Sequence, residues 1–239
     1  MFQFNDILKK SFQLVKPIFL ESLCLSCGQN SDQLLCRYCY KLIKKLTYPN
    51  NACQTCGNLT IKNRQCDQCL LKPPPWQSLS IAFYYDSLIQ NLFQSFKFNH
   101  NFKAAAFLCE QFSQAIIKKS HLEADIIIPV PIHRQRNITR GYNQSIILAN
   151  ALSKALNIPL NTKYIKRSKY TKAQTLLEGK VRKDNVKEAF SIRSKKTYQH
   201  IIVVDDIITT GSTLTSFCNT LSQADNPKIQ TVTFAKPLK

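Results

Sequence analysis

The stretch from Ile201 to Thr213 constrains the fold more than any other part of the chain. It begins with four β-branched aliphatic residues without alternation, which indicates a short strand buried on both faces. Two adjacent acids, Asp205 and Asp206, follow, and then a loop of small hydroxyl residues around a glycine. The next apolar residues have helical spacing. This order of elements is typical of a ligand site at the carboxyl end of a central strand in an α/β sheet.

The small-residue loop is suited to holding a phosphate group. Its five residues are Thr209, Thr210, Gly211, Ser212 and Thr213. Glycine permits a tight backbone whose N–H groups point inward, and a helix start adds partial positive charge. The two acids lie about one sugar length away, where their carboxylates can accept hydrogen bonds from ribose hydroxyls. The alternative, a buried strand followed by an ordinary helix cap, leaves the two acids unexplained.

Eight of the ten cysteines form four CxxC pairs in a short N-terminal region. They are Cys24, Cys27, Cys36, Cys39, Cys53, Cys56, Cys66 and Cys69. The spacing is C-x2-C-x8-C-x2-C and then C-x2-C-x9-C-x2-C, so the region is an internal repeat. Two pairs supply the four thiolates of a tetrahedral zinc site, which predicts two closed, structural zinc ions in a double zinc ribbon.

Two other uses of the cysteines were weighed against zinc. Disulfides conflict with the expected cytoplasmic location, and four pairs exceed what one redox site needs. We favour ligation of one ion by the first four cysteines and of another by the second four. Interleaved pairing remains an alternative at this stage.

The formal charge of +19, from 33 Lys and Arg against 14 Asp and Glu, indicates a polyanionic partner. Between Ile126 and His200 we count sixteen basic residues against three acids, so the excess concentrates in the expected ligand domain. A role of the charge in solubility alone is the weaker interpretation. Nucleic acid is therefore the predicted macromolecular partner.

The N-terminal residues 1–23 are expected to form an amphipathic helix that packs on the domain. A membrane-surface helix is the alternative. Neither a secretory signal nor an apolar run of about 18 residues is visible, which predicts no transmembrane segment. The predicted location is the cytoplasm, with a peripheral position at the inner membrane as a variant of it.

The remaining chain alternates strand and helix patterns after a Pro-rich linker. The linker spans residues 71–78 and carries the only tryptophan, Trp76, which is expected to pack where the modules meet. Strands are expected over residues 80–85, 124–130, 163–167, 201–204 and 230–235. Helices are expected over residues 88–98, 103–118 and 144–156, the last capped by Asn143. A further turn of helix is expected around Arg182.

A second loop rich in arginine follows the strand at residues 124–130. It contains Arg134, Arg136 and Arg140, and Arg182 lies later in the chain. Guanidinium forks match phosphate oxygens, so these four residues are candidates for binding pyrophosphate or a nucleic-acid backbone. A solvated basic loop is the alternative interpretation.

The acidic pair and the TTGST loop resemble the motif with which type I phosphoribosyltransferases bind 5-phosphoribosyl-1-pyrophosphate (PRPP). The resemblance implies that Asp205 and Asp206 hold the ribose hydroxyls and act at the reacting centre. It implies that residues 209–213 hold the 5-phosphate, and that Mg2+ accompanies PRPP. No Gly-Lys-Ser/Thr is present, so a Walker A loop is excluded.

The whole chain from about Cys24 resembles the ComF family. The similarity rests on PVPxxxxRxxxRGYNQS before the helix at 144–156 and on later Gln174, Arg182 and Asn185. Many relatives have Phe where this chain has Tyr142. The resemblance implies handling of single-stranded DNA during natural transformation, with other competence or recombination proteins as further partners.

The predicted fold is a type I phosphoribosyltransferase-like α/β domain, with a mostly parallel sheet and helices on both faces. It occupies residues 79–239 and follows a double zinc ribbon at 24–70. One hypothesis makes the protein a PRPP-binding DNA-handling protein. The other makes it an active phosphoribosyltransferase that transfers ribose 5-phosphate to a nucleobase-type acceptor.

Overall fold

The computed structural model describes residues 23–60, 65–98, 102–132, 142–167 and 189–237. The predicted N-terminal helix and the predicted turn around Arg182 fall on residues outside these ranges. The chain divides into two compact units, residues 1–42 and 43–239. The first group of four cysteines lies in the first unit. The second group lies in the second unit, together with the sheet.

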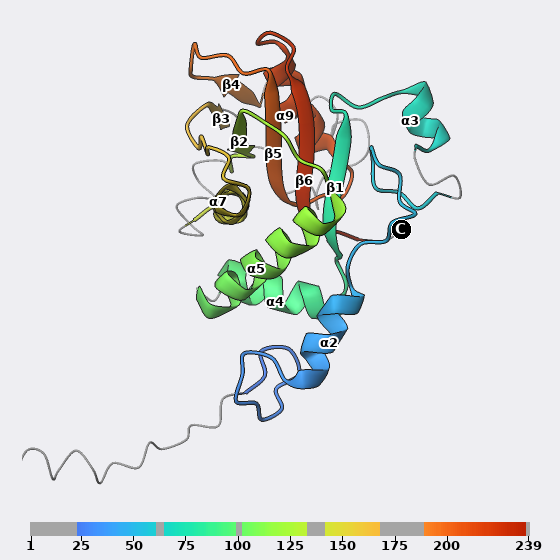
Figure 1. Ribbon diagram of the computed structural model, residues 1–239, viewed down its shortest axis with the longest axis vertical. Helices are drawn as coiled ribbons and strands as arrows, with labels where there is room; N and C mark the ends of the chain where they lie inside the picture. Colours follow the sequence, from blue (N-terminus) through green and yellow to red (C-terminus); the bar gives the residue numbers. More distant parts are fainter. Residues whose placement is uncertain (1–22, 61–64, 99–101, 133–141, 168–188, 238–239) are drawn as a thin grey trace, which may run out of the picture. The chain divides into compact units, whose positions relative to one another are not determined.

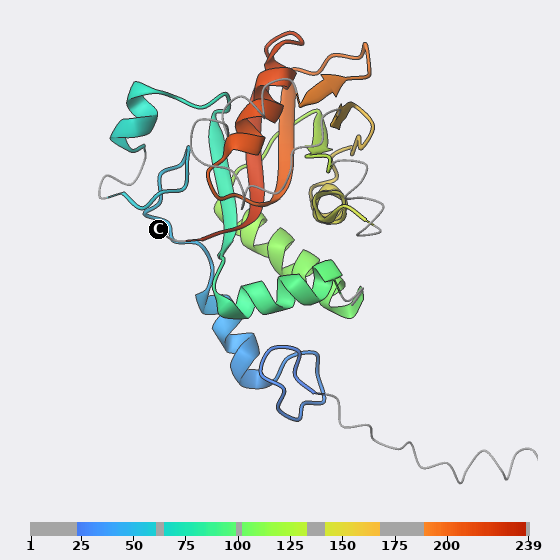
Figure 2. The same cartoon turned by 180° about the vertical axis from the view of Figure 1, so that it is seen from behind.

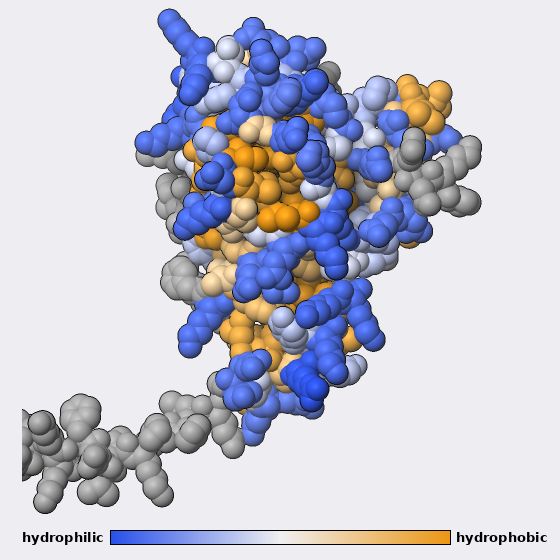
Figure 3. Space-filling view, in the orientation of Figure 1, coloured by the Kyte–Doolittle hydropathy of each residue, from blue (hydrophilic) through white to orange (hydrophobic). Residues whose placement is uncertain are grey.

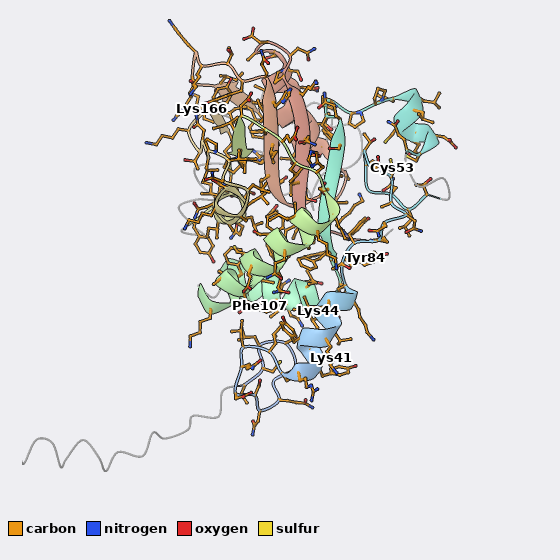
Figure 4. The ribbon with its side chains drawn as sticks, viewed as in Figure 1. Lys41, Lys44, Cys53, Tyr84, Phe107 and Lys166 are labelled. Atoms are coloured by element: carbon orange, nitrogen blue, oxygen red, sulfur yellow. The ribbon has the colours of Figure 1, made fainter. Side chains whose placement is uncertain are left out.

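In the first unit, a tight turn precedes a short helix. Leu25 N–H donates to Leu34 C=O at 3.0 Å, and Leu23 forms an antiparallel bridge with Asn30. Helix α2, Arg37–Lys45, begins within the first group of cysteines. Its last turn carries Lys44 and Lys45, whose charge favours the carbonyl end of the helix. Lys41 and Lys44 are exposed on this helix (Figure 4).

The second unit is built on a parallel sheet with the strand order β1-β6-β5-β2. The strands are β1 Ser78–Tyr84, β2 Ile126–Pro129, β5 His200–Ile207 and β6 Lys228–Lys236. Strand β5 pairs with both neighbours, since Ile201 faces Ile126 on one side and Ile229 on the other. This central place explains its unbroken aliphatic run, because both of its faces are covered.

Helices cover the two faces of the sheet, as the sequence predicted. Helix α9, Ser212–Ser222, lies over one face (Figure 2), with Leu214, Phe217, Cys218 and Leu221 buried. Helices α5, Phe102–Lys119, and α7, Gln144–Leu156, lie on the other face (Figure 1). Helix α4, Ser87–Phe98, packs on α5.

Each face of the sheet has its own apolar layer. On the α9 face, alternate residues of the strands, such as Ile128 and Val203, pack with Phe217. On the other face, aromatic rings dominate: Phe234 stacks on Phe93 with ring centroids 4.9 Å apart and also contacts Phe112. These two layers hold β5 rigidly, and its carboxyl end therefore presents the acidic pair from a fixed position.

A small antiparallel pair completes the unit. Strand β3, Ile165–Arg167, pairs with β4, Phe190–Ile192, and Arg167 faces Phe190. The sequence predicted β3 but not its partner. The end of the unit that carries β3 and β4, called the hairpin end below for this antiparallel pair, is covered by hydrophilic side chains (Figure 3).

The second group of cysteines packs against the free edge of β1. Tyr48 N–H donates to Ala82 C=O at 2.9 Å, and Leu79 N–H donates to Gln54 C=O at 2.7 Å. Cys53 lies beside this strand (Figure 4). Short helix α3, Asp67–Leu71, carries the last cysteine of the group, and the Pro-rich segment then leads into β1. An edge that would otherwise expose unpaired backbone groups is thereby covered.

Candidate functional site

A cavity of about 240 Å³ lies at the carboxyl end of β5. The two predicted acids and all five residues of the predicted phosphate loop line it. The end of β2 contributes residues 130–132, while Ser145 and Arg167 come from α7 and β3. The structure therefore brings together the residues that the sequence placed at one strand end, at the position where open α/β sheets bind ligands.

Asp205 is buried at the base of the cavity, where it is 8% exposed. Its Oδ1 accepts hydrogen bonds from Ser145 Oγ at 3.2 Å and from the N–H of Asp206 at 2.9 Å. Burial, and then the charge of Asp206, raise the pKa of Asp205 to about 8, although these hydrogen bonds and the charge of Arg167 oppose the rise.

Asp206 is more accessible than its neighbour. Its Oδ1 accepts the N–H of Ile207 at 2.7 Å, which fixes the side chain against its own backbone. Its charge reaches Tyr85, whose pKa is raised by burial first and by Asp206 second. The pair therefore presents one buried and one partly exposed carboxyl to the same cavity.

The TTGST loop, residues 209–213, turns from β5 into α9. Gly211 has a φ of 75° and caps the helix, a conformation that an L side chain rarely adopts. Thr210 Oγ1 donates to Ser212 Oγ at 3.1 Å, and Gly211 C=O accepts the N–H of Thr215 at 2.8 Å. The first N–H groups of a helix lack partners within the helix, so this loop and the start of α9 suit an anionic group.

The start of α7 closes the other side of the cavity. Asn143 caps the helix by accepting the N–H of Ser145 at 3.0 Å, and its Nδ2 donates to Val130 C=O at 3.0 Å. This amide thus joins the two ends of the arginine-rich loop. The candidates Arg134, Arg136, Arg140 and Arg182 all lie outside the described residues, so their roles stay predictions.

Two lining residues were missed by the sequence reasoning. Arg167 lies 5.4 Å from the ring centroid of Phe190, and its charge acts on Asp205. It follows an expected strand, but only the pairing of β3 with β4 places it at the cavity. Ser145 is the last residue of the PVPxxxxRxxxRGYNQS motif, but that motif did not indicate that its hydroxyl would reach Asp205.

The structure brings the cysteines together as two groups in sequential order. The four Sγ atoms of Cys24, Cys27, Cys36 and Cys39 lie within 4.8 Å of one another, and so do those of Cys53, Cys56, Cys66 and Cys69. All ten cysteines are free. The Sγ atoms of Cys27 and Cys36 are 3.8 Å apart, and those of Cys56 and Cys66 are 3.6 Å apart. Both groups can therefore bind a metal ion.

These distances fit zinc. Two sulfurs bonded to one zinc ion at about 2.3 Å in a tetrahedral site are separated by about 3.8 Å, whereas a disulfide needs about 2.05 Å. Burial opposes ionisation of Cys24 and Cys53, but backbone N–H groups outweigh it and lower the pKa of each thiol to about 6, whereas burial raises the pKa of Cys39 and Cys69. In the second group, the N–H of Cys66 donates to Cys53 Sγ at 3.3 Å. Thiolates are the form that binds metal.

The part of the chain that the structure describes contains no helix both long enough and apolar enough to cross a membrane.

Comparison with known proteins gives one family match and several curated relatives. The phosphoribosyl transferase domain family matches residues 142–239. Competence protein F of Haemophilus influenzae is 34% identical over 89% of this chain and 96% of its own length. DNA utilization protein YhgH of Escherichia coli K12 is 31% identical over 71% of this chain and 77% of its own. Competence protein ComFC of Bacillus subtilis is 27% identical over 77% and 75%.

Proposed function

The chain belongs to the family of competence protein F and has a phosphoribosyltransferase domain. From this premise we propose that it binds PRPP and that it handles single-stranded DNA during natural transformation. The observation that carries the first half is the single cavity shared by the acidic pair and the TTGST loop. The names of the relatives, competence protein F and DNA utilization protein YhgH, together with the charge of +19, support the proposed handling of single-stranded DNA.

In the proposed complex, each part of the cavity has a distinct task. The N–H groups of residues 209–213 hold the 5-phosphate, and Asp205 and Asp206 accept hydrogen bonds from the ribose hydroxyls. Arg167 adds a guanidinium that matches phosphate oxygens. Mg2+ would bind together with the diphosphate and neutralise part of its charge. Carboxylate oxygens are among the ligands that this ion takes.

The two cysteine groups are proposed to hold one structural Zn2+ each. The sulfur spacing described above supports this assignment. Four thiolates complete a tetrahedral site, so no position remains for a reacting water. The expected result is two zinc ions per chain by elemental analysis, reduced to one by a Cys→Ser change in either group.

A basic surface on the hairpin end of the second unit supports the DNA half of the proposal. Its exposed cations are Lys163, Lys166, Arg193, Lys195 and Lys196. Lys196 lies 5.3 Å from the ring centroid of Tyr198, which keeps one cation beside an aromatic ring. Backbone phosphates and bases are held by such combinations without sequence preference.

Salt dependence tests the DNA half. The affinity for a single strand should fall steeply from about 50 to 200 mM salt, because neutralised phosphates release counterions. The relevant quantity is the slope of the logarithm of the binding constant against the logarithm of the salt concentration. Removing two of the exposed lysines on this surface should reduce the magnitude of that slope by about 1.4, at about 0.7 per phosphate contact. Weak binding with no salt dependence would contradict the proposal.

The ribose-phosphate half is tested by an Asp205→Asn variant. The folded-state pKa of Asp205 lies above the usual value, so its ionisation costs native stability as pH rises from about 4 through 8. The asparagine has no such cost and should make the protein more stable at pH 9. Calorimetry with PRPP and Mg2+ should show binding to the natural protein and none to the variant.

Asp225→Asn is the matched control, since Asp225 is an exposed acid in a left-handed turn that asparagine also tolerates. It should leave the affinity for PRPP unchanged. A natural protein that binds no PRPP would contradict the ribose-phosphate half of the proposal.

Catalytic transfer of ribose 5-phosphate to a nucleobase-type acceptor is the second candidate function. The observation that favours it is Arg167, which adds a cation at the cavity beside the acidic pair. Such a cation would stabilise charge on a departing pyrophosphate. Pyrophosphate release from PRPP in the presence of each nucleobase tests it, and no release with any base would contradict it.

A further inference from the structure

The second group of cysteines reaches the TTGST loop through Trp76. The indole Nε1 donates to the carbonyl of Thr55 at 2.7 Å, and Thr55 lies between the ligand candidates Cys53 and Cys56. The far edge of the same ring lies against the loop, because a Cβ built on Gly211 would be 4.0 Å from Cη2 of Trp76. One buried side chain therefore donates a hydrogen bond to the metal-binding turn and has its other edge beside the candidate phosphate loop.

Lys236, near the end of β6, makes a second connection. It is 7% exposed, and its Nζ donates to the carbonyl of Thr209 at 3.4 Å, at the start of the loop. Its stem passes the metal-binding turn, since a Cβ built on Gly57 would lie 3.2 Å from Lys236 Cδ. Trp76 and Lys236, which come from different segments, thus each connect the turn of the second cysteine group to the TTGST loop.

Both connections depend on the shape of the turn formed by residues 53–58. Cys53 C=O accepts the N–H of Gly57 at 2.8 Å, and the N–H of Cys53 donates to Asn58 C=O at 2.7 Å. A bound metal ion would add four bonds to these hydrogen bonds and fix the turn more firmly, whereas four unligated cysteines add no such bonds. The carbonyl that Trp76 uses and the glycine that Lys236 passes both belong to this turn.

We propose that Trp76 and Lys236 are positioning residues that couple the second metal site to the TTGST loop, so that metal binding and ribose-phosphate binding strengthen each other. Coupling of this kind is reciprocal: the factor by which metal raises the affinity for PRPP equals the factor by which PRPP raises the affinity for metal. The binding half of this inference rests on the proposed function, while its structural half does not require PRPP to bind.

Hydrogen exchange tests the structural half. Amides of residues 209–214 should exchange about tenfold faster in Cys56→Ser than in the zinc-loaded natural protein, because the loop loses its support. Cys27→Ser, the equivalent change in the first group, is the control and should leave the exchange of these amides unchanged. Equal loop exchange in all three proteins would overturn the coupling, whether or not PRPP binds.

Trp76→Phe and Lys236→Met keep the experiment decisive if Cys56→Ser fails to fold. Both leave all eight cysteines in place and should retain two zinc ions per chain. Phenylalanine removes the donor to Thr55, and methionine removes the donor to Thr209, so each should speed exchange of residues 209–214 without zinc loss. A merely structural role would instead speed exchange throughout the sheet, and that result would overturn the proposal.

Zinc affinity tests the binding half. In Cys27→Ser only the second site is intact, and chelator competition should show that PRPP with Mg2+ raises its zinc affinity about tenfold, within the usual range of coupling. In Cys56→Ser only the first site is intact, and PRPP should have no effect on it. Adding Trp76→Phe to Cys27→Ser should reduce the tenfold effect to less than threefold.

The outcomes separate the two claims. If PRPP binds to Cys27→Ser by calorimetry but does not change its zinc affinity, the coupling is overturned and the proposed function stands. If PRPP fails to bind the natural protein, the proposed function is overturned, and loop exchange in the variants decides the structural coupling. Fluorescence of Trp76, the only tryptophan, gives an independent readout of PRPP binding in the natural protein.

Discussion

The two cysteine groups have nearly the same local structure. In each, a CxxCG turn places its glycine at positive φ, 72° for Gly28 and 73° for Gly57. Gly28 N–H donates to Cys24 C=O at 2.9 Å, and the corresponding bond of Gly57 is 2.8 Å. Each turn is closed by an antiparallel bridge between the residues that flank it. The repeat seen in the sequence is therefore a structural repeat at this level.

Their surroundings differ completely. A Cβ built on Gly28 would meet nothing within 4 Å, whereas one built on Gly57 would lie 2.3 Å from Ile81 Cδ1 of β1. Tyr48 also donates its hydroxyl to Gly57 C=O at 2.5 Å. The first turn belongs to a unit of its own, and the second belongs to the compact unit of the sheet. The same CxxCG turn thus occurs once in a separate module and once as part of a domain core.

The largest test of this difference removes one ligand from each group. Cys53→Ser should destabilise the sheet by several kcal/mol, because its site supports the edge of β1 and structural zinc supplies much of the folding free energy of such sites. Cys24→Ser should unfold its own unit, but the free energy of unfolding of the sheet should stay within about 0.5 kcal/mol of its value in the natural protein. Thermal unfolding followed by circular dichroism, with zinc analysis, measures both.

The comparison fails if the two serine variants lower the unfolding temperature of the sheet equally. That result would mean that the first group also contributes to the stability of residues 43–239. A chelator titration of each variant identifies which zinc ion is lost first.

A substitution of each glycine by alanine tests the same difference with a smaller expected loss of stability. Alanine at either position adopts the same unfavourable φ, which costs about 1–2 kcal/mol. Gly57→Ala must in addition displace the buried Ile81 side chain, and overpacking of this kind costs about 1–3 kcal/mol more. The loss in free energy of unfolding, measured with denaturant, should therefore be about 1–3 kcal/mol larger for Gly57→Ala than for Gly28→Ala. Equal losses would show that Ile81 turns aside without cost.

The sequence predicted local structure well and long-range contacts poorly. The strand before Asp205 and the helix capped by Asn143 follow from runs of a few residues, so they were predicted. The packing of Gly57 on Ile81 joins segments that the sequence assigned to different modules, and nothing in CxxCG distinguishes one copy from the other. Arg167 was missed for a related reason, since the two strands whose pairing places it, β3 and β4, are separated by the 22 residues 168–189, and the sequence there has only weak periodicity.

The smallest expected effect comes from removing the hydroxyl of Tyr48 while keeping its aromatic ring. Tyr48→Phe leaves the buried carbonyl of Gly57 without its donor and should cost about 1–2 kcal/mol. Tyr38→Phe is the matched control in the first unit, where Tyr38 is 70% exposed, and should change stability by less than about 0.5 kcal/mol. Urea unfolding at pH 7 compares the pair.

The pH dependence of that stability difference tests the burial of the Tyr48 phenol. Burial, followed by Tyr84 and Cys56, raises the pKa of Tyr48 to about 12 in the folded protein, above the value of 10 for an unfolded chain. The raised pKa means that the folded state favours the protonated phenol, so its stabilisation is complete below pH 10 and is lost as pH rises toward 12. The stability difference between the natural protein and Tyr48→Phe should therefore be constant below pH 10 and shrink above it. A difference that stays constant to pH 12 would show that the folded protein does not raise the pKa of Tyr48.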